Sequence, residues 1–573
     1  MISKKILISG IVLFLSVFLF MGFNVKANES INYLCHLDEL TDVIKIQNHE
    51  MLKVYTYAKY PEYKPIGALN DPINGLEGEA CVDDVARAVI VYLKHYSYYK
   101  DSHSLTKAKQ GLNFVMYMQD PDGEFYNFML PGLKISKNGP TSYKAINFWG
   151  ARAIWSLSWG YQVFKDIDIE YGEKISGHLG KGINALERII KKNNTTIPFN
   201  DKQVPKWTEL MGSDCISVCV LGLVKYYEIK PSNKLSGLIT ELCEVISKTR
   251  FGSFIEFPFS AFISYVKNPD TWHGWGNRQT HALARAGSIL KRPDWIKAAE
   301  NEAENFYSHL LASDIVGVMN PYPDLKSEQI AYTISPMIQG LLSLYEVTNK
   351  KKYAQYAGLI TTWFYGNNIL GKQMFIPEKG LVFDGICKDK VNMDSGAEST
   401  IEGIMSLMDI QHNPVAKRYI QYKEVSRNSF QIIKNNPETN NIFFKIITPG
   451  DYIFYIHHKT SSKRDKVIIN IDNESSKGAP VSINSGVFDT NKINMDISRK
   501  NPFHPIEKNK TKIFLEAGEH FIALTGDKKS IEQIIIQPVI ESKTFINHEG
   551  NFIVLLRNFD KETVSLIEPV VKR

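Results

Sequence analysis

Six apolar helical stretches recur along the first two-thirds of the chain, and each has polar or small residues at its head. Within each stretch the apolar residues return every three or four positions, the spacing of one face of an α-helix. The stretches begin at Asp84, Asn147, Ser213, Asn277, Ala331 and Ser395. Because these starts are roughly 55 to 65 residues apart, the pattern is typical of a repeated structural unit. The sequence therefore predicts six similar units.

Between these stretches we expect six helices of a second kind, which are amphipathic and more highly charged. They are predicted at residues 37–57, 105–119, 171–192, 233–248, 294–311 and 351–363. The link from each polar-headed helix to the next amphipathic helix is short, whereas the returning link is long and rich in Gly, Pro and aromatic residues. When the long loops of successive hairpins all lie on one side, the six polar heads lie together at that end. That end is the expected functional face.

Six inner and six outer helices in alternating hairpins predict an (α/α)6 toroid. Through this sixfold pattern, residues 37–410 resemble the six-hairpin glycosidase-like superfamily. The resemblance implies a carbohydrate-active enzyme, since the superfamily includes many secreted hydrolases and lyases. We predict a catalytic toroid domain at residues 28–412.

The character of the sequence changes after Gln411. Short β-branched and aromatic runs, such as Tyr452-Ile-Phe-Tyr-Ile and Phe552-Ile-Val-Leu-Leu, are separated by Asn, Gly, Lys and Ser. Such runs predict short strands joined by turns. We therefore predict an antiparallel β-sandwich at residues 413–573. A toroid followed by a sandwich also resembles the layout of toroid lyases and of some toroid hydrolases.

The first 27 residues have the pattern of a secretory signal peptide. Lys4 and Lys5 precede an almost wholly apolar segment, and Val25 and Ala27 occupy the −3 and −1 positions of a cleavage site. We expect cleavage after Ala27 and a secreted or cell-envelope protein. The chain would be attached to a membrane only if this segment were retained as an anchor.

Charge and cysteine usage limit the partners. The formal net charge is +6 and the lysines are scattered, so we expect no nucleic-acid partner, although a mildly basic surface suits an acidic substrate. Cys81, Cys215, Cys219 and Cys243 lie in apolar helical runs, where cysteine is usually a small buried side chain. Export permits disulfides, but these positions argue against them. We expect no metal and no cofactor, and the oligomeric state stays open.

Carboxylates at the helix heads are the candidate catalytic groups. Hydrolysis of a glycosidic bond needs one protonated carboxyl group and a second carboxylate as base or nucleophile. The candidates are Asp83, Asp84, Asp214 and Glu398. Repulsion between the adjacent Asp83 and Asp84 favours a raised pKa, as an acid catalyst requires. Alternatively, these acids cap helices or pair with Arg87, Arg152 and Arg278.

Aromatic side chains near the heads are candidates for binding sugar rings, whose apolar faces stack on flat aromatic groups. Trp207, Trp272 and Trp275 lie in polar loops, which favours substrate contact. Trp149 is followed by an apolar run and fits a core position equally well. The other predicted substrate-binding residues are His273, Asn277, Arg278 and Tyr332, with Tyr143 nearby.

Three functions remain, in this order. The first is a secreted glycoside hydrolase, inverting as the resemblance implies, that pairs Asp83 or Asp84 with Asp214 or Glu398. The second is a polysaccharide lyase that neutralises a uronate with Arg, Asn or His and abstracts the α-proton with Tyr or His, although the acids at the heads would repel uronates. The third is a non-catalytic carbohydrate-binding or envelope protein, because a fold does not determine a function.

Overall fold

The computed structural model describes residues 31–46, 48–71, 75–192, 195–320, 328–436, 438, 441–458, 467–473, 504–505, 512–526 and 531–568. The predicted signal peptide at residues 1–27 lies outside the described residues. None of the helices described is both long enough and apolar enough to cross a membrane.

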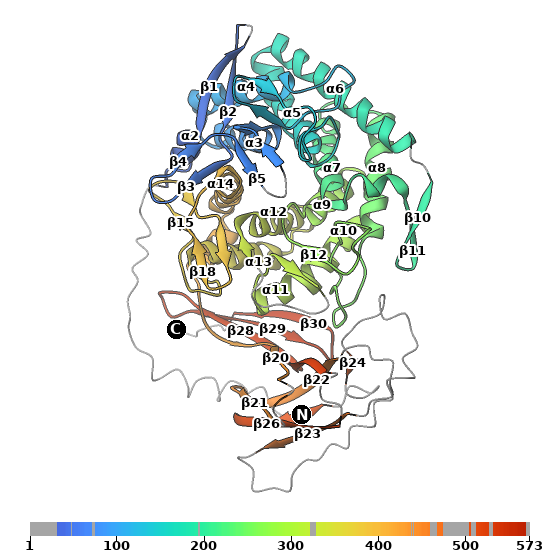
Figure 1. The fold of residues 1–573 in the computed structure, drawn as a ribbon, viewed down its shortest axis with the longest axis vertical. Coiled ribbons are helices and arrows are strands. Elements are labelled where there is room, and N and C mark those ends of the chain that lie inside the picture. Colours follow the sequence, from blue (N-terminus) through green and yellow to red (C-terminus); the bar gives the residue numbers. More distant parts are fainter. Residues whose placement is uncertain are drawn as a thin grey trace.

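Six helices form a closed inner ring, one from each predicted unit (Figure 1). They are α3 (Val82–Tyr99), α5 (Phe148–Ile167), α7 (Ser213–Tyr227), α9 (Gln279–Ile289), α12 (Ala331–Thr348) and α14 (Ala397–Gln411). Each helix packs against the next along the chain, and α14 packs against α3. Their buried apolar side chains form one continuous core. The predicted (α/α)6 toroid is confirmed.

Amphipathic helices cover most of the outside of this ring (Figure 1). They are α4 (Ser102–Tyr117), α6 (Ile169–Lys192), α8 (Asn233–Lys248), α10 (Pro293–Asn301) and α13 (Lys351–Thr361). A π-helical segment, η2 (Glu302–Tyr307), continues α10 into α11 (Ser308–Ala312). The links from inner to outer helices are short, and three of them turn at residues with positive φ, Lys100, Lys291 and Asn349.

The prediction of an outer helix at residues 37–57 is wrong. The structure has a five-residue helix, α2 (Cys35–Glu39), and a hairpin of β1 (Thr41–Ile46) and β2 (His49–Val54). The segment Thr41-Asp-Val-Ile-Lys-Ile is rich in β-branched residues, which favour a strand. Because α2 packs against α14, and β2 against α3 and α4, these short elements occupy the place of the sixth outer helix.

The N-terminal ends of the six inner helices lie together at one end of the toroid. At the opposite end, side chains from all six helices surround one cavity, to which they contribute Lys94, Trp159, Lys225, Arg285, Glu346 and Asp409. Because the helices meet there with their later turns, their first turns meet at the other end. We call that other end the funnel; its floor carries Asp83, Arg152, Asp214, Arg278 and Glu398, which stand in or next to the first turns of the inner helices.

An antiparallel sheet of four strands follows the toroid and packs against it. Its order is β19 (Lys423–Asn428), β28 (Ile540–Ile546), β29 (Phe552–Asn558) and β30 (Thr563–Ile567). Phe545, Ile553 and Leu555 of this sheet belong to the same apolar core as the toroid. The sheet therefore shares a core with the helical domain.

Two further antiparallel sheets form a second core. One contains β20 (Gln431–Lys434), β27 (Ile531–Pro538), β22 (Gly450–His458), β24 (His504–Pro505) and β25 (Ile513–Leu515). The other contains β21 (Asn441–Ile446), β26 (Gly518–Gly526) and β23 (Val467–Asn473). Buried residues of both sheets, such as Ile446, Phe454, Ile522 and Ile536, pack together. The predicted antiparallel β-sandwich is confirmed.

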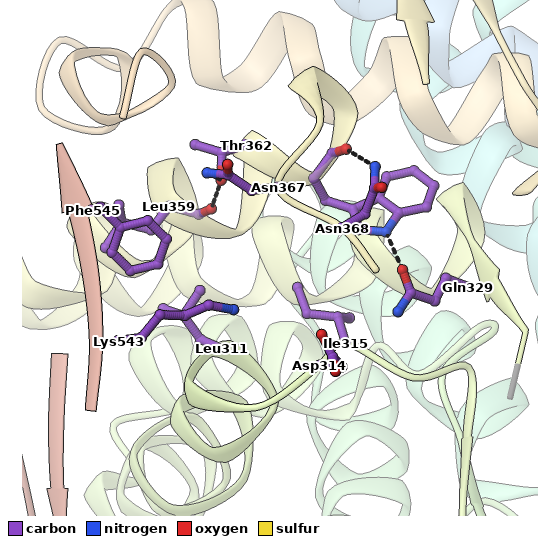
Figure 2. A pocket seen from close by; sticks show the side chains of 11 residues that line it. Leu311, Asp314, Ile315, Gln329, Leu359, Thr362, Asn367, Asn368, Lys543 and Phe545 are labelled. Atoms are coloured by element: carbon purple, nitrogen blue, oxygen red, sulfur yellow. Dashed lines mark hydrogen bonds between the residues drawn. The ribbon is translucent and has the colours of Figure 1, made fainter. Parts of the chain in front are cut away.

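A buried ion pair lies where the first sheet meets α11. The guanidinium of Arg557 donates to Glu541 Oε2 at 2.6 Å, and both side chains are fully buried. Arg557 also donates to Ser308 Oγ at 3.0 Å and to His309 Nδ1 at 2.9 Å. Nearby, Lys543 and Phe545 of β28 lie beside helices α11 and α13 (Figure 2). The junction thus depends on charges that must stay paired.

Replacing Glu541 by Gln should lower the free energy of unfolding by about 3–5 kcal/mol, because Arg557 would stay buried without a carboxylate partner. Urea unfolding measures the change. Glu562→Gln, on an exposed turn, is the matched control and should change stability by less than about 0.5 kcal/mol.

The difference in the free energy of unfolding between the wild type and Glu541→Gln should be smaller at acid pH. Burial alone raises the pKa of Glu541, but the interactions with His309 and with the charge of Arg557 outweigh burial and lower the pKa to about 2. A carboxyl with a lowered folded-state pKa stabilises the protein above its unfolded pKa of about 4.3 and loses this contribution as pH falls through the folded value. An equal difference at neutral and acid pH would contradict this account.

Candidate active site in the funnel

The funnel floor is an ion network centred on Arg87 of α3. Its guanidinium donates to Asp83 Oδ2 at 3.2 Å, Asp84 Oδ1 at 2.8 Å and Glu402 Oε1 at 3.2 Å, and reaches Glu398 Oε2 at 3.4 Å. Arg87 is completely buried. A buried cation requires such compensation, so this arginine determines where the carboxylates of α3 and α14 lie.

Glu402 of α14 lies at the centre of the ring and is completely buried. Besides Arg87, it accepts a hydrogen bond of 2.7 Å from Arg278, which precedes α9. Burial by itself raises the pKa of Glu402, but the positive charges of Arg278 and Arg87 outweigh burial, so the pKa lies below its usual value. Glu402 therefore stays ionised and has no free face. Nothing in the sequence pattern separated it from the apolar helix in which it stands.

Asp83 and Asp84, two of the predicted catalytic residues, are held by arginines. Asp83 pairs with Arg152 of α5 as well as with Arg87, and its backbone N–H donates to Asn127 Oδ1 at 3.2 Å. Burial raises the pKa of Asp83 against the opposing charge of Arg87. Asp84 is almost fully buried, and its Oδ2 accepts from the Cys81 thiol at 3.1 Å. Both carboxylates act here as counterions.

Glu398 is the carboxylate at the floor that remains open to solvent. Its side chain is 46% exposed, and among the residues that the structure describes its one ion pair is the 3.4 Å contact with Arg87. It stands one helical turn before Glu402 on α14. The part of the Glu398 side chain that is buried loses hydration, which raises the pKa of Glu398 against the charge of Arg87, and the neighbouring Asp84 adds to the rise. A solvent-accessible carboxyl with a raised pKa has the properties of a general acid.

Asp214 and His273, both predicted site residues, lie close together. Asp214 is the second residue of α7, and its Oδ1 accepts from the backbone N–H of Cys215 at 2.8 Å. Its Oδ2 lies 3.8 Å from His273 Nε2. The His273 ring donates from Nδ1 to the carbonyl of Trp275 at 3.1 Å. This hydrogen bond places the proton of the neutral ring on Nδ1 and leaves the Nε2 lone pair directed toward Asp214.

His273 is a neutral acceptor. Burial lowers the pKa of His273, although the carboxylate of Asp214 acts in the opposite direction. Nε2 has no hydrogen-bond partner among the residues that the structure describes. Two acceptors 3.8 Å apart cannot bond to each other, but both can accept from one water molecule placed beside them, and either can accept from a single hydroxyl group. The pair is therefore suited to hold and deprotonate a hydroxyl group.

Exposed aromatic rings flank this pair. Trp275 is 39% exposed and stacks on His273 with ring centroids 4.3 Å apart. Tyr265, 47% exposed, lies 5.7 Å from the same imidazole. The negative charge of Asp214 is the largest cause that raises the pKa of Tyr265, which places the phenol beside that carboxylate. Tyr265 is not among the predicted site residues, because it stands in a loop without a helical pattern.

Three of the predicted substrate-binding tryptophans lie in the core. Trp149, Trp207 and Trp272 are each 1% exposed. Trp149 donates from its indole N–H to the carbonyl of Phe125 at 2.7 Å, and Trp272 packs edge-on against Phe306. These rings have no face available to a ligand in this structure. Tyr143, 47% exposed and edge-on to Trp149, is open to solvent instead.

The remaining predicted residues shape the floor. Asn277 donates to the carbonyl of His273 and accepts from Ser264 at 2.6 Å, so it holds the His273 loop. The Tyr332 ring lies near two guanidiniums. Its centroid is 4.9 Å from Cζ of Arg87 and 5.2 Å from Cζ of Arg152. Gly276 has a positive φ of +75°, and a Cβ added to it would lie 2.9 Å from the Tyr332 hydroxyl oxygen. Glycine therefore allows Trp275 to lie against the floor.

No group of three or more His, Cys, Asp or Glu side chains suited to a metal occurs among the described residues. All six cysteines are unpaired, and four of them, Cys81, Cys215, Cys219 and Cys243, are buried. The predicted position of these four cysteines in the apolar interior is confirmed.

No protein-family model and no curated protein matches the sequence. Among solved structures, the chain is similar to cellobiose 2-epimerase from Bacillus thermoamylovorans B4167, with 11% identity and a TM-score of 0.46 over 66% of this chain and 96% of that one. It is also similar to a GH127 β-arabinofuranosidase, with 10% identity and a TM-score of 0.39 over 82% of this chain and 74% of that one. A cellulase of C. cellulolyticum shares 9% identity, with a TM-score of 0.37 over 57% and 82%. All three are named as carbohydrate-active enzymes, but likenesses this distant carry no conclusion about activity.

Replacing Glu402 by Gln should lower the free energy of unfolding by about 3–5 kcal/mol, because Arg87 and Arg278 would share one neutral partner in the core. Denaturant unfolding measures the loss, with the exposed Glu241→Gln of α8 as the matched control. In the double variant Arg87→Met/Glu402→Gln the two losses should be less than additive, because one interaction is removed twice. Additive losses would show that the pair is not coupled.

Proposed function

We propose that this chain is a secreted glycoside hydrolase whose active site is the funnel. The observation that carries the proposal is Glu398, a half-exposed carboxyl with a raised pKa at the floor of a ring of helices. Because its pKa is raised, Glu398 keeps its proton to higher pH and can donate it to the oxygen of the leaving sugar.

The second half of the reaction falls to Asp214 and His273. Asp214 Oδ2 and His273 Nε2 lie 3.8 Å apart, and a water molecule held beside them would lose a proton to this pair as it attacks the sugar. A water held by a base on the opposite side of the sugar from the acid gives inversion of configuration. Trp275, Tyr265 and Tyr143 present exposed faces for sugar rings to stack on.

The signal-peptide pattern at residues 1–27 supports a location outside the cell, which suits a polysaccharide substrate. This part of the proposal rests on the sequence alone.

A polysaccharide lyase is the second candidate, because His273 is a neutral base with a free Nε2. In a lyase this nitrogen would remove the proton next to a uronate carboxyl group. Arg152, which pairs with Asp83 at the funnel floor, would neutralise that carboxyl group. The carboxylates around the funnel count against this candidate, since they repel a uronate.

The test is to incubate the chain from Asn28 onward with neutral and acidic polysaccharides while recording both new reducing ends and the ultraviolet absorbance of unsaturated uronates. We expect reducing ends without absorbance. Both signals together would identify a lyase. Neither signal over a broad panel would favour a carbohydrate-binding protein without catalysis.

Glu398→Gln should lower kcat by about 10²–10⁴-fold, the usual contribution of a general acid. The variant should also lose the fall in activity that the wild type shows as pH rises through the pKa of Glu398. Steady-state kinetics across pH measures both effects. Glu241→Gln serves as the control, and an unchanged kcat in Glu398→Gln would remove this residue from the mechanism.

A further inference from the structure

A second site lies at the end of the toroid opposite the funnel. Here the later turns of the inner helices surround a cavity of about 330 Å³. Each helix contributes at least one polar or aromatic side chain, among them Lys94, Trp159, Lys225, His281, Gln339 and Asp409. We call it the basal cavity. Its volume falls within the range of small-molecule sites, and packed protein interiors rarely leave so large a space.

The charges that line the basal cavity balance. Three side chains are cationic (Lys94, Lys225 and Arg285) and three are anionic (Glu228, Glu346 and Asp409). Lys94 donates twice to Asp409, at 2.8 and 2.7 Å, and Arg285 donates to Glu228 at 2.7 Å and Glu346 at 3.2 Å. An ionised ligand would leave one charge uncompensated in a confined space, so the cavity favours an uncharged occupant.

Two polar groups in the wall lack hydrogen-bond partners. Lys225 Nζ donates to no residue that the structure describes; its nearest carboxylate oxygen, Glu228 Oε2, is 3.9 Å away. His281 Nδ1 is also without a partner among the described residues. Burial lowers the pKa of Lys225 to about 8 and lowers that of His281, which is neutral and able to accept. Within the described part of the chain, the wall thus carries an unpartnered donor, Lys225 Nζ, and an unpartnered acceptor, His281 Nδ1, although Nδ1 itself has almost no solvent-accessible surface.

An aromatic surface accompanies these groups. Trp159 is partly exposed, and Lys225 Nζ lies 4.1 Å from the centre of its indole. Trp155 lines the cavity as well, with Arg278 of the funnel floor 5.0 Å from the centre of its ring. A molecule that carries several hydroxyl groups and one apolar ring face satisfies the free donor, the free acceptor and the indole of Trp159 together.

We propose that the basal cavity binds an uncharged monosaccharide, which hydrogen-bonds to Lys225 and His281 and packs against the indole of Trp159. Glu398, Asp214 and His273 do not line the basal cavity, so this site is distinct from the proposed active site.

Competitive acetylation of the wild-type protein tests the proposal without a substitution. Acetic anhydride is added in trace amounts with D-glucose, D-galactose or D-mannose, and the labelled lysines are quantified by peptide mass spectrometry. At a sugar concentration of about ten times Kd, labelling of Lys225 should fall by about tenfold. Lys230, an exposed residue that follows the same helix, is the internal control and should be labelled equally throughout.

The outcomes separate this site from the funnel. Protection of Lys225 should persist in Glu398→Gln, and the affinity measured by calorimetry should fall at least tenfold in Lys225→Gln and in His281→Leu, but not in Lys230→Gln. Absence of protection by all three sugars would overturn the proposal. Protection by D-glucuronate alone would overturn the inference of an uncharged ligand. Loss of protection in Glu398→Gln would place the bound sugar in the funnel instead.

Discussion

The toroid depends on one buried carboxylate, Glu402, at the centre of the inner ring. It joins α14 to Arg87 of α3 and to Arg278 before α9, so a single residue connects helices that lie far apart in the sequence. Because none of the three side chains is accessible to water, each must be paired within the protein. Arg87 in turn positions Asp83, Asp84 and Glu398. The geometry of the funnel therefore follows from an ion pair beneath it.

This network gives identical carboxyl groups different roles. Asp83 and Asp84 are occupied by Arg87 and Arg152, whereas Glu398 makes one longer contact and stays open to solvent. The same distinction applies to the aromatic rings: Trp149 and Trp272 pack in the core, and Trp275 faces the funnel. Exposure and pairing, rather than residue type, decide which side chains can meet a substrate.

A polar path runs through the apolar ring. Arg278 donates to Gln339, Gln339 donates to Asp409 at 3.1 Å, and Asp409 accepts from Lys94. The path begins at Glu402 under the funnel and ends in the wall of the basal cavity. Buried hydrogen-bonded chains of this kind are stable only when every member is satisfied. The two ends of the toroid are thus connected by a continuous series of hydrogen-bonded side chains.

The sequence by itself determined the sixfold helical pattern, the antiparallel strands after Gln411 and the gathering of Asp83, Asp214 and Glu398 at one end, because periodicity and loop length are local properties. It did not reveal the hairpin at 41–54, where β-branched residues overrode the expected repeat, nor the roles of Glu402 and Tyr265. Those depend on partners such as Arg278 and Asp214, which are distant in the chain or on another element. Only the closed ring brings these charges within a few ångströms of one another and removes water from them. Both conditions are needed to decide which carboxyl group is a counterion and which is free to react.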